Sequence, residues 1–483
     1  MLNLTVQPLI IYHMLSETVK LKDTIVSIAT FPAQAAVGII KLSGSRSIDI
    51  VSSVFKPKNN KNLKKVRNFS LHYGHIIAGN GHSGAKKIDS VIIDEVLVAV
   101  MRAPDSYTRE DVVEIHSHSG QYLLNTILEL CVSKGARLAE PGEFTKRAFL
   151  NGRIDLVQAE GVLDAINATT DDSLRLSMDQ LSGRLSQKLE DILEDLRRVC
   201  IELEASFSFP EDVSIDSADS LRLCRKAAKD IKALLRYSDK ARLFRDGVRC
   251  VICGKTNVGK SSLLNMLLEE ERVIVTSVAG TTRDVIEESI NIRGLPLRIS
   301  DTAGILRPRD LIEEKAMQKS YSMIDSADLI LFVVDSSRPL NKDDRSVLKK
   351  IADKNVVVVY NKSDLSSRVD RSFVDAYGFR SVDISARDHR GLSELEKAVY
   401  SAAGAGSLPK GSDVYVSNRR HIGLLKSSLP LIDKTIEELS GADFSDQALF
   451  LAKQAYADIA AILGRDAGRD VLDDVFSSFC IGK

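Results

Sequence analysis

Tryptophan is absent from this chain of 483 residues, and aromatic residues make up only 5% of it. Aromatic platforms on which single-stranded nucleic acid could stack its bases are therefore scarce. An excess of charge of one sign is also missing, because 66 lysines and arginines balance 66 aspartates and glutamates. This balance argues against a generally basic coat for nucleic acid, but it allows a local basic patch.

Cysteines and long apolar runs are scarce as well. Six cysteines in a chain of this length do not form a disulfide scaffold. They fit a reducing compartment, and we expect a cytoplasmic protein. No run approaches the roughly 18 apolar residues of a membrane span, so no membrane partner is expected. Residues 1–22 lack the basic start and the cleavage site of a signal peptide. We interpret them as a disordered extension or as the result of a misassigned start, with Met14 as the other candidate.

What is present is the composition of a globular protein, with 44% hydrophobic residues and a length typical of about three domains. Residues 23–154 mix strand-like and helix-like runs and predict an α+β domain. Strands are expected at 25–29, 37–42, 92–101 and 112–115, and helices at 123–134 and 142–150. Residues 56–67 carry six basic residues and no acid, which is typical of a solvated loop, with RNA contact as the alternative.

Helical periodicity dominates from residue 155 onward. Nine apolar residues from Leu174 to Leu203 cover 29 residues in eight steps, the 3.6-residue period of one α-helix with a buried face. Further helices are expected at 218–244, 422–439, 445–463 and 470–479. Two helical blocks thus flank a different central segment. This pattern predicts a helical domain, 155–245 and 406–483, that is interrupted by an inserted domain, 246–405.

The inserted segment alternates strand and helix signals. A strand at 248–253 is followed by a glycine-rich loop and a helix at 261–268. Further buried strands are expected at 297–300, 329–334 and 356–360. This alternation predicts an α/β domain with a parallel sheet that is covered by helices on both faces.

A phosphate-binding motif follows the first of these strands. Residues 254–261 match G-x-x-x-x-G-K-[ST] in full. The glycines let backbone N–H groups turn toward phosphate oxygens, Lys260 brings a charge to the β- and γ-phosphates, and the Ser261 hydroxyl can bind Mg²⁺. The helix that begins here points its positive end at the phosphates. A chance glycine-rich turn is the alternative, but the position between a strand and a helix argues against it.

Two further segments fit the same phosphate chemistry. Asp301 follows the strand at 297–300 and is placed to hold Mg²⁺ through water, and the N–H of Gly304 can sense the γ-phosphate. Thr281 and Thr282 lie between the two motifs. One of these threonines could complete the Mg²⁺ shell when the loop orders around a triphosphate.

Specificity for the base is predicted from residues after the strand at 356–360. Residues 361–364 read Asn-Lys-Ser-Asp, and the Asp364 carboxylate can accept from both N1–H and N2–H₂ of guanine. Adenine lacks this donor pair and would leave the carboxylate unpaired. After a later strand, Ser385 and Ala386 can offer a backbone N–H to guanine O6. The predicted nucleotide is therefore GTP and not ATP.

The residue after Gly304 departs from the usual pattern. Many such enzymes carry there a glutamine that orients the attacking water, but this chain has Ile305. Another group must take that role, and the nearby acids are Asp310, Glu313 and Glu314. No arginine finger is evident in the motifs, and a bound cation could supply the missing charge.

Residues 254–261, 279–284, 301–304 and 361–364 together resemble the Era-like translational GTPases. Three stretches outside the insert narrow this resemblance, namely residues 104–116, 141–156 and 479–483, the last of which reads Phe-Cys-Ile-Gly-Lys. With them, about residues 23–483 are similar to the MnmE (TrmE) family of bacterial tRNA modification GTPases.

The resemblance implies a fold with an N-terminal domain for folate binding and dimerisation, a helical domain, and an inserted Ras-like P-loop GTPase domain. It implies a homodimeric GTP hydrolase that forms a heterotetramer with an FAD-dependent partner. The two proteins would add an aminomethyl-type group, such as carboxymethylaminomethyl, to C5 of the wobble uridine of tRNA. The carbon would come from a tetrahydrofolate of the 5-formyl or methylene type. The GTPase domains would pair when GTP and K⁺ are bound.

The resemblance also assigns ions and a catalytic acid. K⁺ is expected at Asn257, Thr276, Val278 and Thr281, and Mg²⁺ at Ser261 and Thr282. Glu313 aligns with the acid that orients the attacking water, although an acid favoured by the dipole at a helix start is the alternative. The predicted GTP site then consists of Gly254, Asn257, Val258, Gly259, Lys260, Ser261, Ser262, Thr276, Thr281, Thr282, Asp301, Gly304, Asn361, Lys362, Asp364, Ser385 and Ala386.

A folate site is implied at Lys41, Glu114, Arg153 and Lys483. An acid can accept paired N–H bonds from the edge of the pterin, and cations suit the glutamate tail. Lys41 stands where the family often has arginine, and the two side chains are not equivalent at a bidentate site.

Two loops near this site depart from the family pattern. Residues 34–36, Gln-Ala-Ala, lack the Arg-Gly character of the usual loop, and Arg109 and Ser119 replace glycines. If those glycines need a positive φ, these loops bend differently in this chain.

Two classes of function are therefore open. The first is an enzyme whose GTP hydrolysis drives tRNA modification. The second is a GTP-switch binding protein, such as a ribosome-assembly factor, with no modification chemistry of its own. A basic RNA-binding sheet after the insert would favour the second, whereas the helical pattern from Asp413 onward favours the first.

Overall fold

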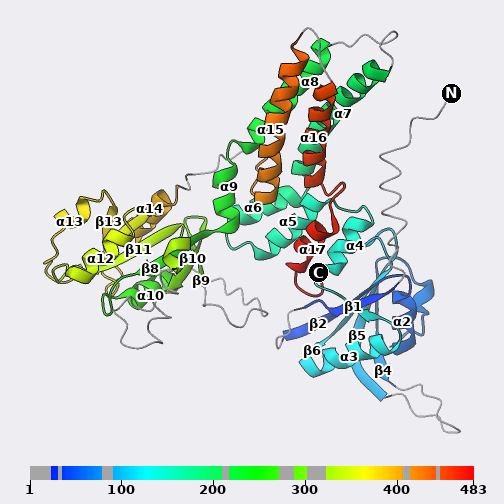
Figure 1. Ribbon diagram of the computed structural model, residues 1–483. Helices are drawn as coiled ribbons and strands as arrows, with labels where there is room; N and C mark the ends of the chain where they lie inside the picture. The colour runs from blue at the N-terminus through cyan, green and yellow to red at the C-terminus, as the bar shows by residue number, and fades with distance from the viewer. Residues whose placement is uncertain are drawn as a thin grey trace. The chain divides into compact units, whose positions relative to one another are not determined.

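The computed structural model describes residues 23–30, 35–78, 91–208, 217–270, 288–301, 322–404, 406, 414–441 and 446–483. These residues form two compact units (Figure 1). Unit 1 combines residues up to Glu160 with Gly464–Lys483, and unit 2 is Gly161–Leu463. The predicted extension, residues 1–22, lies outside the described residues.

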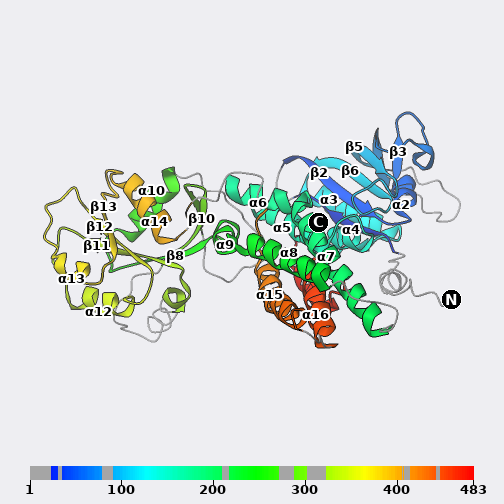
Figure 2. The same ribbon diagram turned by 90° about the horizontal axis from the view of Figure 1, so that it is seen from above.

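Unit 1 contains a seven-stranded sheet in the order β3-β4-β5-β6-β2-β1-β7, as far as the structure describes the chain. Neighbouring strands are antiparallel, except that β1 and β7 run parallel. The strand β3 forms an edge of this sheet and contacts α2 (Figure 2). The strands are β1 Ile25–Ile28, β2 Ala35–Ser43, β3 Phe55–Pro57, β4 Ser70–Ala78, β5 Val91–Met101, β6 Val112–Ser119 and β7 Arg137–Leu138.

Two helices cover one face of this sheet, α2 (Ser47–Val54) and α3 (Gln121–Ser133). They bury alternate residues of the strands, such as Ile40 and Ile115, in one core, as expected for a sheet with one covered face. Beside the sheet, α4 (Glu143–Leu150) packs against α17 (Arg469–Ser477) from the distant part of the chain. The predicted strands and helices of this region are thus present, but α2, β3, β4, β7 and α5 (Leu156–Asn167) were not predicted.

Four helices of unit 2 form a bundle in which α15 packs against α8 and α16, and α7 packs against α8 and α16. The four helices are α7 Arg184–Ser208, α8 Ser217–Leu235, α15 Arg419–Leu439 and α16 Asp446–Ile462, while α6 Asp171–Leu181 precedes α7 and α9 Ser238–Asp246 follows α8. The long helix predicted from the 3.6-residue period is wrong in one respect, because α6 and α7 are separate. Gly183 lies between them with a φ of +79°, which turns the chain out of the right-handed helix.

This break changes which side chains are buried. Leu174 and Met178 of α6 are 45% and 48% exposed, whereas the periodic residues of α7 from Leu185 to Leu203 are buried. The helix expected at 218–244 is also divided, because α8 ends at Leu235 and α9 begins at Ser238.

The rest of unit 2 contains a six-stranded sheet in the order β13-β12-β11-β8-β10-β9 (Figure 1). All pairs run parallel except β9 with β10. The strands are β8 Val248–Cys253, β9 Glu288–Ile292, β10 Leu295–Asp301, β11 Leu329–Asp335, β12 Val356–Asn361 and β13 Arg380–Asp383.

Helices cover both faces of this second sheet. Since successive residues of a strand point to opposite faces, each strand packs side chains against both layers of helices. Ile252 and Val333 face α10 (Lys260–Glu270) and α14 (Leu392–Ala402). Val251 and Phe332 instead face α12 (Lys342–Lys350) and α13 (Ser372–Asp375). The predicted fold class is therefore confirmed: an α+β domain, a helical domain, and an inserted α/β domain with a parallel sheet.

The predicted domain boundaries stay predictions. The compact units place residues 464–483, which the sequence assigned to the second helical block, with the N-terminal sheet. None of the helices that the structure describes is long and apolar enough to cross a membrane.

Candidate functional site

The loop between β8 and α10 has a backbone that leaves no room for side chains at its glycines. Gly254 has a φ of +146° and Gly259 a φ of +98°. A Cβ atom at Gly254 would collide with the carbonyl oxygen of Val333, and one at Gly259 would collide with Nδ2 of Asn361. Both glycines are therefore required by backbone conformation and by space. The loop closes around a position in front of the N-terminus of α10, where an anion is favoured.

The polar side chains of this loop agree with a phosphate site. Lys260 is 8% exposed, and its Nζ donates to the carbonyl oxygen of Lys255 at 2.8 Å. The ammonium group is thus held inside the loop and not spread into solvent. Ser261 and Ser262 are exposed at the start of α10, where a hydroxyl can reach Mg²⁺. Asn257 has a left-handed backbone with a φ of +64°.

Asn361, at the end of β12, connects three loops. This side chain is 2% exposed. Its Nδ2 donates to the carbonyl oxygen of Val258 at 2.9 Å, and its Oδ1 accepts from the N–H groups of Lys362 at 2.8 Å and Ala386 at 3.1 Å. The predicted base-binding residues are therefore tied to the phosphate loop by buried hydrogen bonds.

Asp364 is the residue that we expect to contact guanine. Its side chain is exposed, and Oδ1 accepts a hydrogen bond from the Ser385 hydroxyl at 2.8 Å. This bond lowers the pKa of Asp364 below its usual value. The carboxylate is thus ionised and oriented at neutral pH, as an acceptor for paired N–H donors must be.

The sequence reasoning missed Asp335, which ends β11. Its Oδ2 lies 2.6 Å from Nζ of Lys362, and the same ammonium group donates to the carbonyl oxygen of Asn257 at 3.0 Å. Burial alone would raise the pKa of Asp335, but hydrogen bonds from Lys362 and Ser337 hold it below its usual value. A signal was present, because Asp335 follows an apolar strand at the same edge of the sheet as Asn361.

Several predicted site residues lie outside the described residues, namely Thr276, Val278, Thr281, Thr282, Gly304 and Glu313. Asp301 is described as the last residue of β10 and pairs with Ile252 of β8. It therefore lies at the edge of the sheet from which the phosphate loop leaves. The structure brings together the phosphate loop, the base loop and Ser385–Ala386, and it does not describe residues 271–287 and 302–321, which carry the other predicted residues.

A second group of predicted residues meets in unit 1. Lys41 of β2 and Glu114 of β6 are register partners, and Nζ of Lys41 lies 4.0 Å from Oε1 of Glu114. The same ammonium group lies 4.5 Å from the centre of the Tyr107 ring, and the Arg153 guanidinium lies 4.7 Å from the centre of that ring. Tyr107, which was not predicted as a site residue, thus lies between two predicted cations.

This group has more positive than negative charge. Burial lowers the pKa of Lys41, and the charges of Lys483 and Arg153 lower it further against the opposing effect of Glu114. The Lys41 ammonium group is therefore repelled by the charges of Arg153 and Lys483 and attracted by that of Glu114. An anionic ligand would relieve that repulsion.

The position of Lys483 depends on Gly482. This glycine has a φ of +100°, and a Cβ atom there would lie 2.6 Å from the carbonyl oxygen of Ile28 in β1. The backbone thus passes directly over the end of β1. A side chain at residue 482 would push Lys483 away from Lys41.

One predicted consequence of the loop departures is wrong. Arg109 adopts a φ of +58° although it is not glycine, and its Nη1 donates to the carbonyl oxygen of Asn151 at 3.0 Å. The left-handed turn is therefore kept in spite of the side chain, held by that bond. Ser119 is a buried residue of β6 without a positive φ. Gln34 lies outside the described residues, and Ala35 and Ala36 begin β2.

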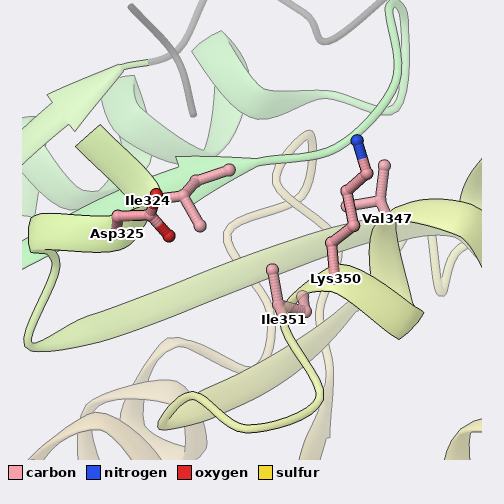
Figure 3. Close-up of a pocket in the computed structure, with 5 residues that line it drawn as sticks. All are labelled: Ile324, Asp325, Val347, Lys350 and Ile351. Atoms are coloured by element: carbon pink, nitrogen blue, oxygen red, sulfur yellow. The ribbon is translucent and has the colours of Figure 1, made fainter. Parts of the chain in front are cut away.

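A small pocket in unit 2 lies apart from the nucleotide loops. Figure 3 shows its lining, with Ile324 and Asp325 opposite Val347, Lys350 and Ile351. Because these residues precede β11 and end α12, the pocket lies at the amino ends of the parallel strands, whereas the loops above leave from the carboxyl ends. The described residues contain no cluster of His, Cys, Asp and Glu that could hold a metal ion.

The chain matches known proteins along nearly all its length. Residues 24–153 match the family described as GTP-binding protein TrmE N-terminus, and residues 156–480 match the MnmE helical domain.

Three curated relatives carry the name tRNA modification GTPase MnmE. That of Thermoanaerobacter pseudethanolicus is 40% identical over 95% of this chain and 99% of its own length. That of Desulforamulus reducens is 40% identical over 96% of this chain and 100% of its own length. The Bacillus subtilis protein is 38% identical over 95% of this chain and 100% of its own length.

Solved structures match a smaller part of this chain than the curated relatives do. The G domain of the Thermotoga maritima FeoB iron transporter is 25% identical and covers 32% of this chain and 98% of its own, with a TM-score of 0.26. Aquifex aeolicus Era bound to GDP and AlF4⁻ is 26% identical and covers 38% of this chain and 66% of its own, with a TM-score of 0.27. At these TM-scores no argument rests on the superpositions.

Proposed function

The chain belongs to the MnmE (TrmE) family of tRNA modification GTPases, and from this premise we propose that its GTP hydrolysis drives modification of the tRNA wobble uridine. As a member of that family it is a GTP hydrolase. The observation that carries the proposal is the junction at Asn361, which joins the phosphate loop at Val258 to the base-binding loops. Bound guanine and bound phosphate are thereby sensed by one connected set of loops.

Mg²⁺ and K⁺ belong to this proposal. Ser261, exposed at the start of α10, supplies a hydroxyl for Mg²⁺ together with Thr282. Asn257 lies in the phosphate loop with a left-handed backbone, and it would hold K⁺ with Thr276, Val278 and Thr281. A monovalent cation there would supply the positive charge that an arginine finger gives to other GTPases. Glu313 would orient the attacking water in place of the missing glutamine.

A tetrahydrofolate derivative is the proposed one-carbon donor. The group of Lys41, Arg153 and Lys483 fits the carboxylates of a glutamate tail, since it holds several cations beside Glu114. The Tyr107 ring offers an apolar surface between two of the cations. Glu114 can accept paired N–H bonds from a pterin. The ligand would supply the carbon, and these residues would hold its charged and aromatic parts.

We further propose a homodimer and an FAD-dependent partner, together forming a heterotetramer that acts on tRNA in the cytoplasm. A second copy of the chain is supported by a part of the unit 1 sheet, at β4 and β5, where the described residues leave apolar side chains exposed. Leu71 of β4 and Leu97 of β5 share one face of that sheet and are 55% and 38% exposed. Apolar side chains gathered on a sheet face are typical of a surface that is covered in an assembly.

The decisive experiment is mass spectrometry of tRNA nucleosides from cells with and without the gene. We expect the modified wobble uridine to disappear on deletion and to return with the wild-type gene, but not with an Asp364→Asn gene. Unchanged nucleosides would contradict the proposal and favour a GTP-switch protein without modification chemistry. In parallel, purified protein should hydrolyse GTP faster in KCl than in NaCl, and equal rates would contradict the assignment of Asn257 to K⁺.

A further inference from the structure

The segment of residues 56–67 in unit 1 is the most basic exposed part of the described chain that neither site above uses. We call it, together with Phe69, the basic segment. It contains six exposed cations, namely Lys56, Lys58, Lys61, Lys64, Lys65 and Arg67. Among the described residues, Lys64 has an acidic partner, Asp49 at 2.8 Å, and no ion pair joins the other five to a carboxylate. The segment therefore presents net positive charge to solvent.

This segment is held in one conformation. Leu63 is 3% exposed and anchors the short 3₁₀ helix Leu63–Lys65 to the core. Directly after β5, the Arg102 side chain donates from Nη2 to the carbonyl oxygens of Leu63 at 3.2 Å and Lys64 at 2.9 Å. The Asn62 side chain accepts from the N–H of Lys64 at 2.9 Å. A loop that is only solvated needs none of these hydrogen bonds. A surface that is already ordered loses less conformational entropy when a ligand binds to it.

Phe69 follows directly and is unusual in two ways. Its φ is +52°, a left-handed conformation that is rare for an aromatic residue, and its side chain is 69% exposed. The Asn68 side chain holds this conformation, because its Oδ1 accepts from the N–H of Phe69 at 2.9 Å and from the N–H of Arg102 at 2.7 Å. Strain of this kind is retained where it serves function. Here the strained backbone presents an aromatic ring to solvent next to a row of cations.

Cations beside an exposed ring are the combination that single-stranded nucleic acid recognises. Phosphates bind lysine and arginine, and an unpaired base stacks on an aromatic face. We propose that the basic segment is the surface with which this chain holds tRNA, with phosphates against Lys58, Lys61 and Lys65 and one unpaired base on Phe69. This inference rests on the proposed function, since tRNA is taken from it.

The charge is tested with the triple variant Lys58→Gln, Lys61→Gln and Lys65→Gln of the full-length protein. The probe is a tRNA transcript with uridine at the wobble position, followed by fluorescence anisotropy across a range of KCl concentrations. Three lost contacts should weaken binding roughly 100-fold at about 0.1 M salt and reduce the slope of log K against log salt by about 2. A matched control neutralises three exposed cations of unit 2, Arg225, Lys229 and Lys349, and should bind like wild type.

The ring is tested with Phe69→Gly. Because glycine adopts a positive φ without strain, this variant should melt at the same temperature as wild type or higher. Loss of one stacked base should nevertheless weaken tRNA binding about 5-fold or more. The melting temperature is thus kept or raised while the affinity for tRNA falls. A misfolded variant would instead have a lower melting temperature. Tyr122→Ala, at a side chain that is 87% exposed on α3, is the control and should change neither.

The outcomes separate this inference from the proposed function. If both variants bind tRNA like wild type while deletion of the gene abolishes the modification, the assignment of tRNA binding to the basic segment is overturned and the proposed function stands. If the triple variant loses binding to vesicles of anionic lipid and not to tRNA, the inference is also overturned. If deletion leaves the nucleosides unchanged, the proposed function fails, and the inference fails with it.

Discussion

Nζ of Lys362 lies 2.6 Å from Oδ2 of Asp335 and 3.0 Å from the backbone carbonyl oxygen of Asn257. A residue of the base loop is thus fixed by an acid from the neighbouring strand and, at the same time, fixes the phosphate loop. The bond neutralises a cation beside the residue to which we assign K⁺. This arrangement keeps the positive charge of Lys362 from competing with the ion.

Asp335→Asn should therefore weaken binding of guanine nucleotides. The substitution removes the charge that holds Lys362 but keeps the size of the side chain, and a hydrogen bond to a charged group contributes about 1–3 kcal/mol. We expect about a tenfold rise in the Kd for fluorescent GDP, measured by titration. The control is Asp353→Asn, at an exposed acid after α12, which should leave the Kd unchanged. Equal Kd values for both variants would contradict the role of Asp335.

Asp364→Asn should change which base is bound. An amide cannot accept from both N1–H and N2–H₂ of guanine, but it can donate to the carbonyl oxygen that xanthine carries in place of N2. The Kd for GTP should rise roughly 100-fold, because donors of the base are left unpaired, and XTP should bind better than GTP. Competition between the two nucleotides measures this preference. A variant that still prefers GTP would remove Asp364 from the base site.

Gly482→Ala should weaken binding of 5-formyltetrahydrofolate without altering any charge. The positive φ of residue 482 and the contact of a Cβ atom with Ile28 force the backbone aside and displace Lys483. Isothermal calorimetry should show a Kd at least several-fold higher. Gly468→Ala is a matched control, because a Cβ atom at Gly468 meets nothing within 4 Å. If both variants bind 5-formyltetrahydrofolate equally well, the position of Lys483 has no influence on folate binding.

Binding of folate should also depend on the protonation of Lys41. Because burial and the nearby charges of Lys483 and Arg153 hold the pKa of Lys41 below the usual 10.5, Lys41 loses its proton earlier than an ordinary lysine as pH rises. Affinity for the anionic ligand should therefore be highest below that pKa and should fall at a lower pH than the titration of an ordinary lysine would give. Lys41→Arg should abolish this fall, because a guanidinium stays protonated. Lys134→Arg, at an exposed lysine of unit 1, should keep the wild-type profile, and identical profiles for all three proteins would exclude Lys41.

Arg147→Met should destabilise unit 1. The Arg147 side chain is 1% exposed, with Nη2 2.7 Å from Asp23 and 2.9 Å from Glu143. Removing the cation leaves these carboxylates unpaired and should cost about 3 kcal/mol, the lower end for a buried pair, since Asp23 is partly screened by solvent. Thermal melting measures the loss. Lys146→Met, which breaks only an exposed pair with Asp473, should change the melting temperature little.

The loss of stability caused by Arg147→Met should become smaller at acidic pH. Burial alone would raise the pKa of Asp23 and Glu143, but hydrogen bonds from Arg137 and Arg147 hold both below their usual values. Their contribution to stability is thus present above about pH 4, the unfolded pKa, and is lost as pH falls through the lower folded values. The difference in stability between wild type and Arg147→Met should narrow as pH falls below about 4. A constant difference would show that charge pairing is not its cause.

Much of the nucleotide site could be predicted because its motifs are local in sequence. Gly254, Lys260 and Asp364 each follow the end of a predicted strand, and the carboxyl ends of parallel strands meet at one edge. Asp335 was missed because its role depends on β11 lying between β8 and β12, an order that the sequence does not reveal. The pairing of Lys41 with Glu114 likewise depends on the register of two strands.

Helix boundaries were predicted less well. The break at Gly183 was missed because the apolar period continues across it, and a glycine inside a periodic stretch can belong to a helix or end it. The left-handed conformation of Phe69 could not be predicted, because it depends on hydrogen bonds of Asn68 that include one from Arg102. Long-range partners decide such positions, and local propensity does not.

Unit 1 is assembled from two parts of the chain that are separated by the whole of unit 2. During synthesis the first sheet leaves the ribosome long before residues 464–483 exist, whereas unit 2 has all its residues earlier than unit 1. The nascent chain can therefore fold its GTP-binding module before Lys483 can join Lys41. A newly made molecule should acquire the ability to bind nucleotide first and the ability to bind a one-carbon donor last.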